Sequence, residues 1–195
     1  MLILRARKNL ELHVSKEQVD ILIGCILGDA YIERRGKIQI EHSGAQKDYT
    51  AWKYEKLQSI SYGSPKKVIR TDNRNGKEYS SYRFWTRQFF RSWRDRFYPD
   101  GKKIIPSDLQ DLSPVTMAIW YMDDGSLADN KRIVLSTDSF DEKSHERLLK
   151  LLKSSFGVRS SLKGSGKILI GTRDAQKLIA RIKPYIHKSM AYKIP

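Results

Sequence analysis

Two short segments of the chain are almost wholly apolar and run directly into carboxylates. They are Leu22–Ala30 (LIGCILGDA) and Met117–Gly125 (MAIWYMDDG), and each reads as a short helix. A helix that is apolar on all sides must be buried. A carboxylate at the C-terminal end of a helix is disfavoured, because that end of the helix dipole is also negative. Since the pattern occurs twice, we expect positive charge at both helix ends, and a pair of divalent metal ions is the natural candidate.

The same order of elements follows each apolar segment. Residues 38–43 alternate apolar and polar side chains, as a half-buried strand does, and residues 133–138 repeat the pattern 95 positions later. Helical periodicity then covers about residues 48–61 in the first copy and begins near Asp141 in the second. Gly63 and Gly157 stand where the C-terminal caps of these helices are expected.

A second hairpin follows in both copies, and a further helix closes each of them. The predicted strands are 66–72 and 79–86 around the turn NRNG, and 159–163 and 167–171 around the turn GSG. The last helices open after Thr86-Arg87 and Thr172-Arg173, and the copies end on Lys103–Pro106 and Lys193–Pro195. The sequence therefore predicts an α+β tandem duplication of two αββαββα halves. We place the halves at residues 1–100 and 114–195, joined by a linker at 101–113 that is rich in Lys, Pro, Asp and Ser.

The net charge of the chain indicates the class of partner that it binds. The 195 residues carry 37 Lys and Arg against 22 Asp and Glu, a net charge of +15. Such a surplus is typical of a protein that binds a polyanion, nucleic acid above all, with an acidic membrane surface as the lesser alternative. The apolar fraction of 39% is enough for a real core. No apolar run approaches the roughly 20 residues of a membrane span, so we expect no membrane partner.

Three smaller observations bear on the compartment and on alternative chemistry. The segment Met1–Leu10 lacks the apolar core of a secretory signal, so we expect the protein in the cytoplasm or an organelle and not secreted. The lone Cys25 lies inside the first apolar segment, where we interpret it as a packed core residue. The histidines lack zinc-like spacing, and we expect most of them at the surface: they are His13, His42, His145 and His187.

The two terminal acids of the apolar segments predict a metal site. A pseudo-twofold duplication would bring the two helices side by side, so that Asp29 and Asp124 face each other. Two such charges about 4 Å apart repel by about 4 kcal/mol at an effective dielectric of about 20. Apart from a raised pKa, the ordinary remedy is shared hard cations such as Mg²⁺, which prefer carboxylate, carbonyl and water ligands. Two acids, metal ions and a basic surface are typical of phosphodiester hydrolysis.

At these residues the sequence resembles the LAGLIDADG homing endonucleases in their single-chain, double-motif form. The motifs Gly28–Tyr31 (GDAY) and Trp120–Gly125 (WYMDDG) are most similar to the group typified by the yeast mitochondrial intron-encoded endonuclease, and the resemblance runs from about Leu22 to Pro195. It implies two pseudo-twofold-related halves whose antiparallel sheets form a DNA-binding saddle. It also implies site-specific double-strand cleavage with Mg²⁺, for which Mn²⁺ could substitute, and mobility of the host intron or intein.

The resemblance assigns roles to the residues at the two motif ends. In that family the eighth motif residue of each half coordinates the metal ions, and it matches Asp29 and Asp124 here. The preceding residue contributes a backbone carbonyl, which implicates Gly28 and Asp123. The Asp123 side chain is extra to the motif, and we interpret it as a helix-end or solvent-facing acid rather than a third catalytic carboxylate.

Three further residues match catalytic positions of the family. Each half places a lysine near the scissile phosphates, and Lys103 and Lys193 match because each precedes the Ile-Pro that closes its half. The alternative interpretation is that they are two surface lysines of a very basic protein. Gln39 matches a polar strand position that orders solvent near the metal ions.

The motif also departs from the family pattern at its central glycine. That position is Gly24 in the first half but Ile119 in the second. Because small residues permit close helix crossing, we expect the second helix to pack differently or to bend.

The hairpins are the expected DNA-reading elements. A two-stranded ribbon fits the major groove, and alternate side chains on its exposed face can reach base edges. The alternative is that many of these side chains keep a sheet soluble or contact only phosphate. The candidates are Arg34, Arg35, Lys37, Gln39, Glu41, Arg70, Asn73, Arg74, Asn75, Lys77, Ser81 and Arg83 in the first half, and Lys131, Arg132, Ser136, Asp138, Arg159, Ser161, Lys163, Ser165 and Lys167 in the second.

Three functional hypotheses remain open. The leading one is a monomeric endonuclease that cuts double-stranded DNA at a long target site. The second is an RNA-binding maturase that helps its cognate intron to splice, and the third is a DNA-binding regulator without nuclease activity. The presence of both Asp29 and Asp124 favours cleavage, because an RNA chaperone or a regulator has no need of metal ligands.

Overall fold

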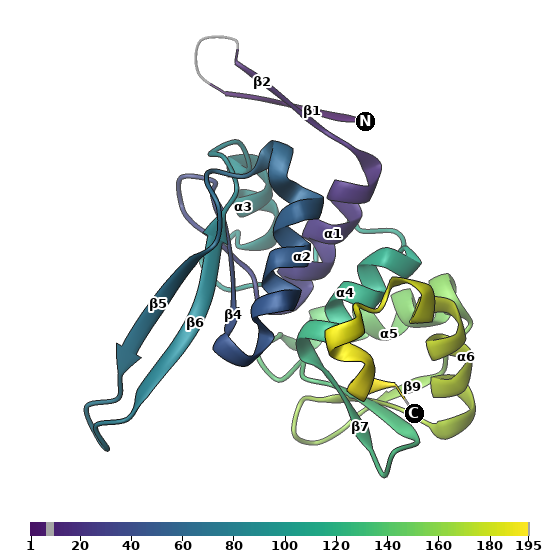
Figure 1. Ribbon diagram of the computed structural model, residues 1–195. Helices are drawn as coiled ribbons and strands as arrows, with labels where there is room; N and C mark the ends of the chain where they lie inside the picture. The colour runs from purple at the N-terminus through teal and green to yellow at the C-terminus, as the bar shows by residue number, and fades with distance from the viewer. Residues whose placement is uncertain (7–9, 195) are drawn as a thin grey trace. The chain divides into compact units, whose positions relative to one another are not determined.

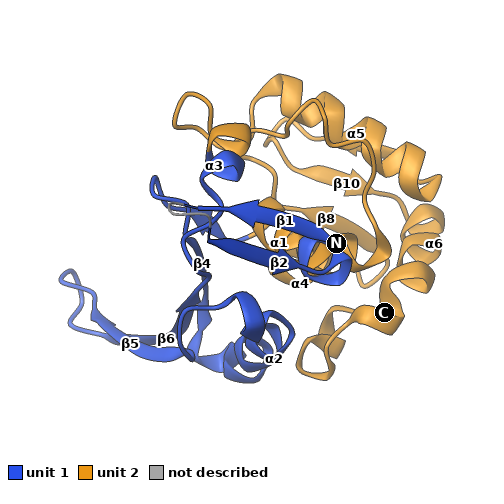
Figure 2. Cartoon of the chain, turned by 90° about the horizontal axis from the view of Figure 1, so that it is seen from above, with its two compact units in different colours: residues 1–19, 29–94 blue, residues 20–28, 95–195 orange. Residues whose placement is uncertain are grey.

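The computed structural model describes residues 1–6 and 10–194, so Pro195 of the predicted closing motif lies outside the described residues. The chain divides into two compact units (Figure 2). The first unit comprises residues 1–19 and 29–94, and the second comprises residues 20–28 and 95–195. None of the helices that the structure describes is long and apolar enough to cross a membrane.

The first unit is built on a four-stranded antiparallel sheet, which we call the first sheet (Figure 1). Its strand order is β3-β4-β6-β5, with bounds β3 Tyr31–Ile32, β4 Ile38–Ser43, β5 Lys66–Thr71 and β6 Glu78–Trp85. Helix α2 (Lys47–Leu57) packs on β4 and β6, and α3 (Arg91–Phe97) begins in this unit. The alternation predicted for residues 38–43 is confirmed, because Ile38, Ile40 and His42 are buried while their neighbours on β4 are not.

An N-terminal hairpin precedes the first sheet and was not predicted from the sequence. Strand β1 (Leu2–Arg5) pairs antiparallel with β2 (Glu11–Val14) and buries Leu4, Leu12 and Val14. Its strands are only four residues long, which is too short for the alternation to stand out in the sequence.

The second unit contains both predicted apolar helices. Helix α1 (Lys16–Leu27) lies in this unit from Asp20 onward, and α4 (Pro114–Asp124) lies beside it. The remaining elements are β7 Gly125–Ala128, β8 Arg132–Leu135, α5 Glu142–Phe156, β9 Ser160–Leu162, β10 Ile168–Ile170 and α6 Thr172–Ile182, followed by 3-10 turns that end at Lys193. The four strands form the second sheet, in the order β7-β8-β10-β9.

Helices α1 and α4 pack closely because one of them carries a glycine at the contact. A Cβ atom at Gly24 would lie 2.6 Å from both the Cβ of Ile119 and the backbone oxygen of Thr116. The Thr116 hydroxyl also donates to the backbone oxygen of Asp20 at 2.9 Å. One small residue therefore accommodates the isoleucine of the opposite helix, and Cys25 is buried in this region as predicted.

The two sheets repeat the same topology, which confirms the duplication. Strand order β3-β4-β6-β5 in the first sheet matches β7-β8-β10-β9 in the second, and a helix follows each hairpin in both copies. The division into halves at residues 1–100 and 114–195 remains a prediction, since the compact units group residues by contact rather than by repeat.

Two local details differ between prediction and structure. Gly157 caps α5 in the left-handed conformation, with a φ of 65°, as predicted. Gly63 does not cap α2, which passes into a 3-10 turn ending at Ile60, so that prediction is wrong. Strand β8 ends at Leu135, earlier than predicted. The Ser136 amide still bonds to the oxygen of Asp124, its partner in the register of β7 and β8, but Asp124 already belongs to α4, so the strand pair goes no further.

Candidate metal centre and nucleic-acid interface

Gly28 and Asp123 lie side by side where α1 and α4 end. A Cβ atom at Gly28 would lie 2.6 Å from the Cβ of Asp123 and 3.0 Å from its Oδ2 atom. No side chain larger than that of glycine fits at position 28 without a shift, so the close packing extends to the very ends of the helices. The structure thus brings together two of the residues that the sequence implicated in metal binding.

The two predicted lysines reach the same helix ends. Lys103 Nζ donates to the backbone oxygens of Ile26, at 3.0 Å, and Gly28, at 2.7 Å. Lys193 Nζ donates to those of Met122, at 2.6 Å, and Asp123, at 3.5 Å. The last carbonyls of a helix have no partner within it and carry its negative dipole end. Each lysine therefore satisfies the end of one helix and is not an ordinary surface lysine, while its role near the phosphates stays a prediction.

Tyr121 fixes the backbone of the second lysine, a contact that the sequence analysis missed. Its hydroxyl donates to the backbone oxygen of Lys193 at 2.5 Å. Burial raises the pKa of Tyr121 to about 12, so the hydroxyl keeps its proton at neutral pH. No local pattern signals this role, because Tyr121 reads in the sequence as one more apolar residue of the helix.

Asp124 is the last residue of α4, and it is partly exposed. Its backbone oxygen accepts a hydrogen bond from the Ser136 amide at 3.1 Å, which ties the helix end to the end of β8. Gly125 follows, and a Cβ atom there would lie 2.0 Å from the Tyr121 ring. The chain thus passes from α4 directly into the extended strand β7, which begins at Gly125.

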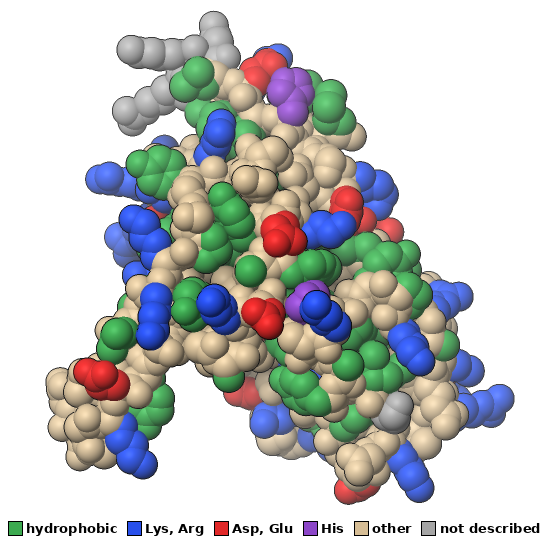
Figure 3. Space-filling view, in the orientation of Figure 1, with side chains coloured by type: hydrophobic (Ala, Val, Ile, Leu, Met, Phe, Trp, Pro, Cys, Tyr) green, Lys and Arg blue, Asp and Glu red, His purple; other side chains and the backbone are tan. Residues whose placement is uncertain are grey.

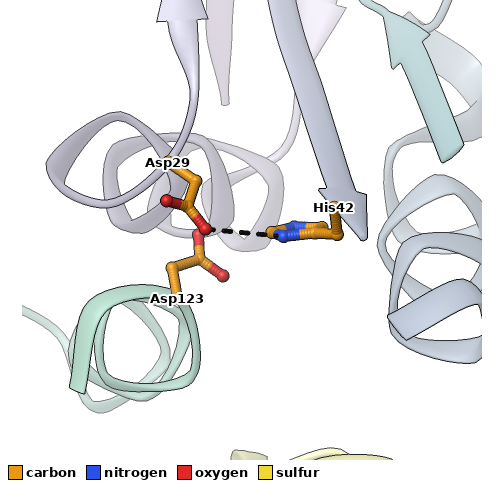
Figure 4. Close-up of side chains that lie close together, drawn as sticks. All are labelled: Asp29, His42 and Asp123. Carbon is orange, nitrogen blue, oxygen red and sulfur yellow. Dashed lines mark ion pairs between the residues drawn. The ribbon is translucent and has the colours of Figure 1, made fainter. Parts of the chain in front are cut away.

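In the first unit, Asp29 lies against a buried histidine. Figure 4 shows the His42 ring, on β4, pointing toward the Asp29 carboxylate, with Nδ1 at 3.5 Å from Oδ2. On its other side, His42 Nε2 lies 3.0 Å from Nζ of Lys53, which is fully buried and sits 4.4 Å from the centroid of the Tyr49 ring. The His42 ring therefore lies between the Asp29 carboxylate and the buried Lys53 amine.

The prediction that the histidines lie at the surface is wrong for two of them. His42 is 4% exposed and His145 is 7% exposed, the latter with Nε2 2.8 Å from the backbone oxygen of Thr137. The signal for His42 was present in the sequence, since the alternation of β4 puts position 42 on the same face as Ile38 and Ile40.

Gln39 lies on the opposite face of β4 from His42. Its Nε2 atom donates to Oε2 of Glu41 at 3.3 Å, on the outer face of the first sheet. The structure therefore groups Gln39 with the DNA-reading candidates, while His42 is the β4 residue that contacts Asp29.

Each unit by itself carries donor atoms of the kind that fit a hard divalent cation. In the second unit Asp123 and Asp124 offer carboxylate oxygens and Gly28 offers a backbone carbonyl, and in the first unit Asp29 offers a carboxylate. Oxygen donors of this kind are the ones that Mg²⁺ prefers, and a divalent ion would also offset the negative charge at the helix ends.

The predicted DNA-reading residues of the first unit lie on the outer face of the first sheet or in its turns. Gln39 pairs with Trp85 across β4 and β6, and Arg70 pairs with Tyr79 across β5 and β6. The other candidates of this unit occupy the turn between β3 and β4 (Arg34, Arg35 and Lys37), the turn between β5 and β6 (Asn75 and Lys77), and β6 itself (Ser81 and Arg83).

The candidates of the second unit lie around the second sheet. Some pair with acids, since Arg132 pairs with Asp129, and Arg159 lies 3.9 Å from Asp174. Lys131 and Lys163 are exposed beside the two hairpin turns, whereas Ser136 and Lys167 are half-buried. On the face shown in the space-filling view, Lys and Arg side chains are far more common than Asp and Glu (Figure 3), in keeping with the net charge of +15.

Comparisons with known proteins show the family of the chain. A profile of the LAGLIDADG DNA endonuclease family matches residues 19–178. The chain is 31% identical to the cytochrome b mRNA maturase bI2 of Debaryomyces hansenii, over 93% of this chain and 74% of the relative. It is 29% identical to the probable intron-encoded endonuclease 1 of Wickerhamomyces canadensis, over 93% of this chain and 85% of the relative.

A solved structure extends the likeness to the fold. The homing endonuclease I-WcaI, bound to its DNA recognition sequence, matches with a TM-score of 0.85 and 27% identity, over 94% of this chain and 88% of that one. The resemblance stated from the motifs is therefore confirmed along nearly the whole chain, and the chain belongs to the LAGLIDADG DNA endonuclease family.

Proposed function

We propose that the chain is a monomeric, site-specific endonuclease that hydrolyses both strands of DNA with Mg²⁺ and so promotes mobility of its host intron or intein. The observation that carries this proposal is the pair of lysines at the helix ends. Lys103 and Lys193 each bond to the last carbonyls of one apolar helix, beside the residues of the two motifs. A basic protein that only needed to attract nucleic acid would have no reason to bring one lysine to each motif.

The residues of the two motifs and the two lysines would have different roles in DNA cleavage. Asp29 and Asp124 would hold the divalent ions, with carbonyl oxygens of Gly28 and Asp123 as further donors. The ions, when bound, activate the attacking water and stabilise the leaving oxygen. Lys103 and Lys193 would place positive charge where negative charge develops on the phosphate in the transition state.

The two sheets would recognise the DNA sequence. Their polar and basic outer side chains would enter the major groove, as strands do in other DNA-binding proteins. The relative bound to its DNA recognition sequence supports double-stranded DNA as the substrate. The relatives with intron-related names support a role in intron biology and a place in the cytoplasm or an organelle.

The decisive experiment uses DNA in which the intervening sequence of the host gene is removed and its flanks are rejoined. We expect a discrete double-strand cut in Mg²⁺ that disappears in EDTA. Asp29→Asn and Asp124→Asn should each reduce cutting by about a thousandfold, since a catalytic metal ion contributes several kcal/mol to transition-state stabilisation. Asp111→Asn, which removes an exposed acid of the linker, is the matched control and should cut normally.

A maturase activity is the second candidate, favoured by the name of the Debaryomyces relative. If the purified protein cuts no DNA but binds its cognate intron RNA tightly, and both Asp→Asn variants bind that RNA equally well, the maturase becomes the better description.

A further inference from the structure

One carboxylate stands among the basic side chains on the outer face of the first sheet. Glu41 lies on β4, with 17% of its side chain exposed, and Arg70 on β5 and Arg83 on β6 both lie within ion-pair distance of it. On a surface that binds DNA, an acid weakens the attraction for phosphate. The position of Glu41 therefore calls for a role other than charge attraction.

Both terminal nitrogens of Arg70 donate hydrogen bonds to the Glu41 carboxylate. Nη1 donates to Oε1 at 2.5 Å, and Nη2 donates to Oε2 at 3.2 Å, in the forked geometry that fixes an arginine most firmly. The Ser81 hydroxyl also donates to Oε1 at 2.5 Å, and Arg70 Nη1 lies 3.2 Å from the same hydroxyl. The hydrogen bond from Arg70 lowers the pKa of Glu41, so the carboxylate is charged at neutral pH.

Arg83 is held on two sides. It stands directly opposite Glu41 in the ladder between β4 and β6, with Nη1 at 3.6 Å from Oε2. Its guanidinium carbon lies 4.5 Å from the centroid of the Trp85 ring, so the plane rests on an aromatic surface. Only 25% of the side chain is exposed. A guanidinium restrained in this way has little freedom left to lose when it binds a ligand.

We infer that Glu41 is a positioning residue that, together with Arg70, holds Arg83 as a preorganised, guanine-reading arginine on the first sheet. Guanine offers two adjacent acceptors, O6 and N7, in the major groove, and the fork of an arginine matches them. The fork of Arg70 is occupied by Glu41, which leaves Arg83 as the reader. Glu41 could otherwise accept a hydrogen bond from the amino group of cytosine, but its oxygens are already engaged by Arg70, Ser81 and Gln39. The inference rests on the proposed function and adds to it which base the first sheet reads.

A purely structural role for Glu41 is the competing explanation. The network joins β4, β5 and β6, so it could serve only to hold the strands together. That role would lower the melting temperature on substitution without changing which bases are preferred. The two explanations therefore separate in a measurement of base preference.

The experiment selects bound sequences from a randomised DNA library in EDTA, where cleavage does not interfere. Three full-length proteins are compared: wild type, Glu41→Gln, and Glu78→Gln as the matched control. Glu78 is an exposed carboxylate at the start of β6, so its substitution removes the same charge from the same sheet. Melting temperatures of all three are recorded, so that only folded protein enters the selection.

We expect the wild type to select guanine at a short run of positions. In Glu41→Gln that preference should fall by about tenfold, which is the loss of one good bidentate base contact, while other positions are unchanged. Glu78→Gln should keep the wild-type profile. Arg83→Lys should lose the same guanine preference, because a point charge cannot reproduce the fork.

Several results would overturn the inference. They are a Glu41→Gln profile identical to the wild type, a uniform rise in affinity for all sequences, or a wild type that selects no guanine. Failure of the proposed function looks different. In that case the wild type cuts no DNA in Mg²⁺, whatever the selection in EDTA shows about the role of Glu41.

Discussion

The side chains buried against the two sheets differ between the copies. The first copy buries a histidine on β4 and a lysine on α2, whereas the matching positions of the second copy hold a buried threonine and a buried leucine. His42 contacts Lys53 in the first copy, and Thr137 and Leu148 stand 95 positions further along the chain. The Thr137 hydroxyl donates to the backbone oxygen of Gly166 at 2.7 Å, and Leu148 belongs to the core cluster of the second unit. The two copies thus share a topology but bury side chains of different polarity and charge.

The outer faces of the two sheets differ in the same way. Glu41, which pairs with two arginines in the first sheet, is matched by Ser136 in the second, where Arg132 on β8 pairs instead with Asp129 in the turn between β7 and β8. The first sheet thus carries its carboxylate on a strand, between two arginines, whereas the second carries it in a turn, beside one. The two copies therefore share a topology but differ in how charged side chains are arranged on them.

The substitution His42→Leu tests whether the buried histidine of the first copy is needed for stability. This change removes a hydrogen-bond partner of the buried Lys53 amine, and we expect it to lower the free energy of unfolding by about 1–3 kcal/mol, the cost of leaving a buried polar group without one of its hydrogen bonds. Adding Lys53→Leu, which gives the first copy the leucine of the second, should recover part of that loss. Chemical denaturation of both variants measures it.

Thr137→Val is the control from the second sheet. It removes one neutral hydrogen bond and should cost only about 1 kcal/mol. A double variant less stable than His42→Leu alone would show that Lys53 is stabilised by contacts other than His42.

Lys103→Met and Lys193→Met test whether the two halves contribute equally to cleavage. Each change removes an ammonium from one helix end, and each should slow cutting by about a hundredfold to a thousandfold, the usual cost of losing one electrostatic stabiliser. Binding of the target DNA should change little. Single-turnover cleavage measures the effect, with Lys102→Met, an exposed neighbour, as the control. A large loss in only one variant would show that the two halves contribute unequally to cleavage.

The smallest expected effect concerns the helix that follows each first hairpin. Asp141 caps α5 by accepting from the Ser144 amide at 2.8 Å, whereas Gln46, at the start of α2, makes no such side-chain bond. Asp141→Ala should therefore destabilise the protein by about 1 kcal/mol. Gln46→Asp should supply the missing cap in the first copy and stabilise it by a smaller amount.

The Asp141 cap also has a defined pH dependence. The hydrogen bond from Ser144 lowers the pKa of Asp141 below its ordinary value. A carboxyl with a lowered pKa contributes stability above the unfolded-state pKa of about 3.9, and this contribution is lost as the pH falls through the folded-state value. The difference in stability between wild type and Asp141→Ala should be constant from pH 5 to pH 8 and shrink below about pH 4. A difference that grows at acid pH would contradict the cap.

The sequence by itself determined the repeat, the strands and the family. Alternation placed β4 at Ile38–Ser43, and the two motifs predicted both α1 and α4, because these features depend on residues that are close in the chain. The acids at the motif ends could be named as metal ligands for the same reason.

Only the tertiary structure decided which distant side chains meet. Lys103 bonds to Gly28 across 75 residues and Lys193 to Asp123 across 70, and no local pattern encodes these contacts. The resemblance had suggested only that each lysine lies near the scissile phosphates. The pairing of His42 with Lys53 and the gathering of two arginines around Glu41 were not predicted at all. Periodicity fixes which face of an element a side chain occupies, but the packing of elements against each other fixes what that side chain contacts.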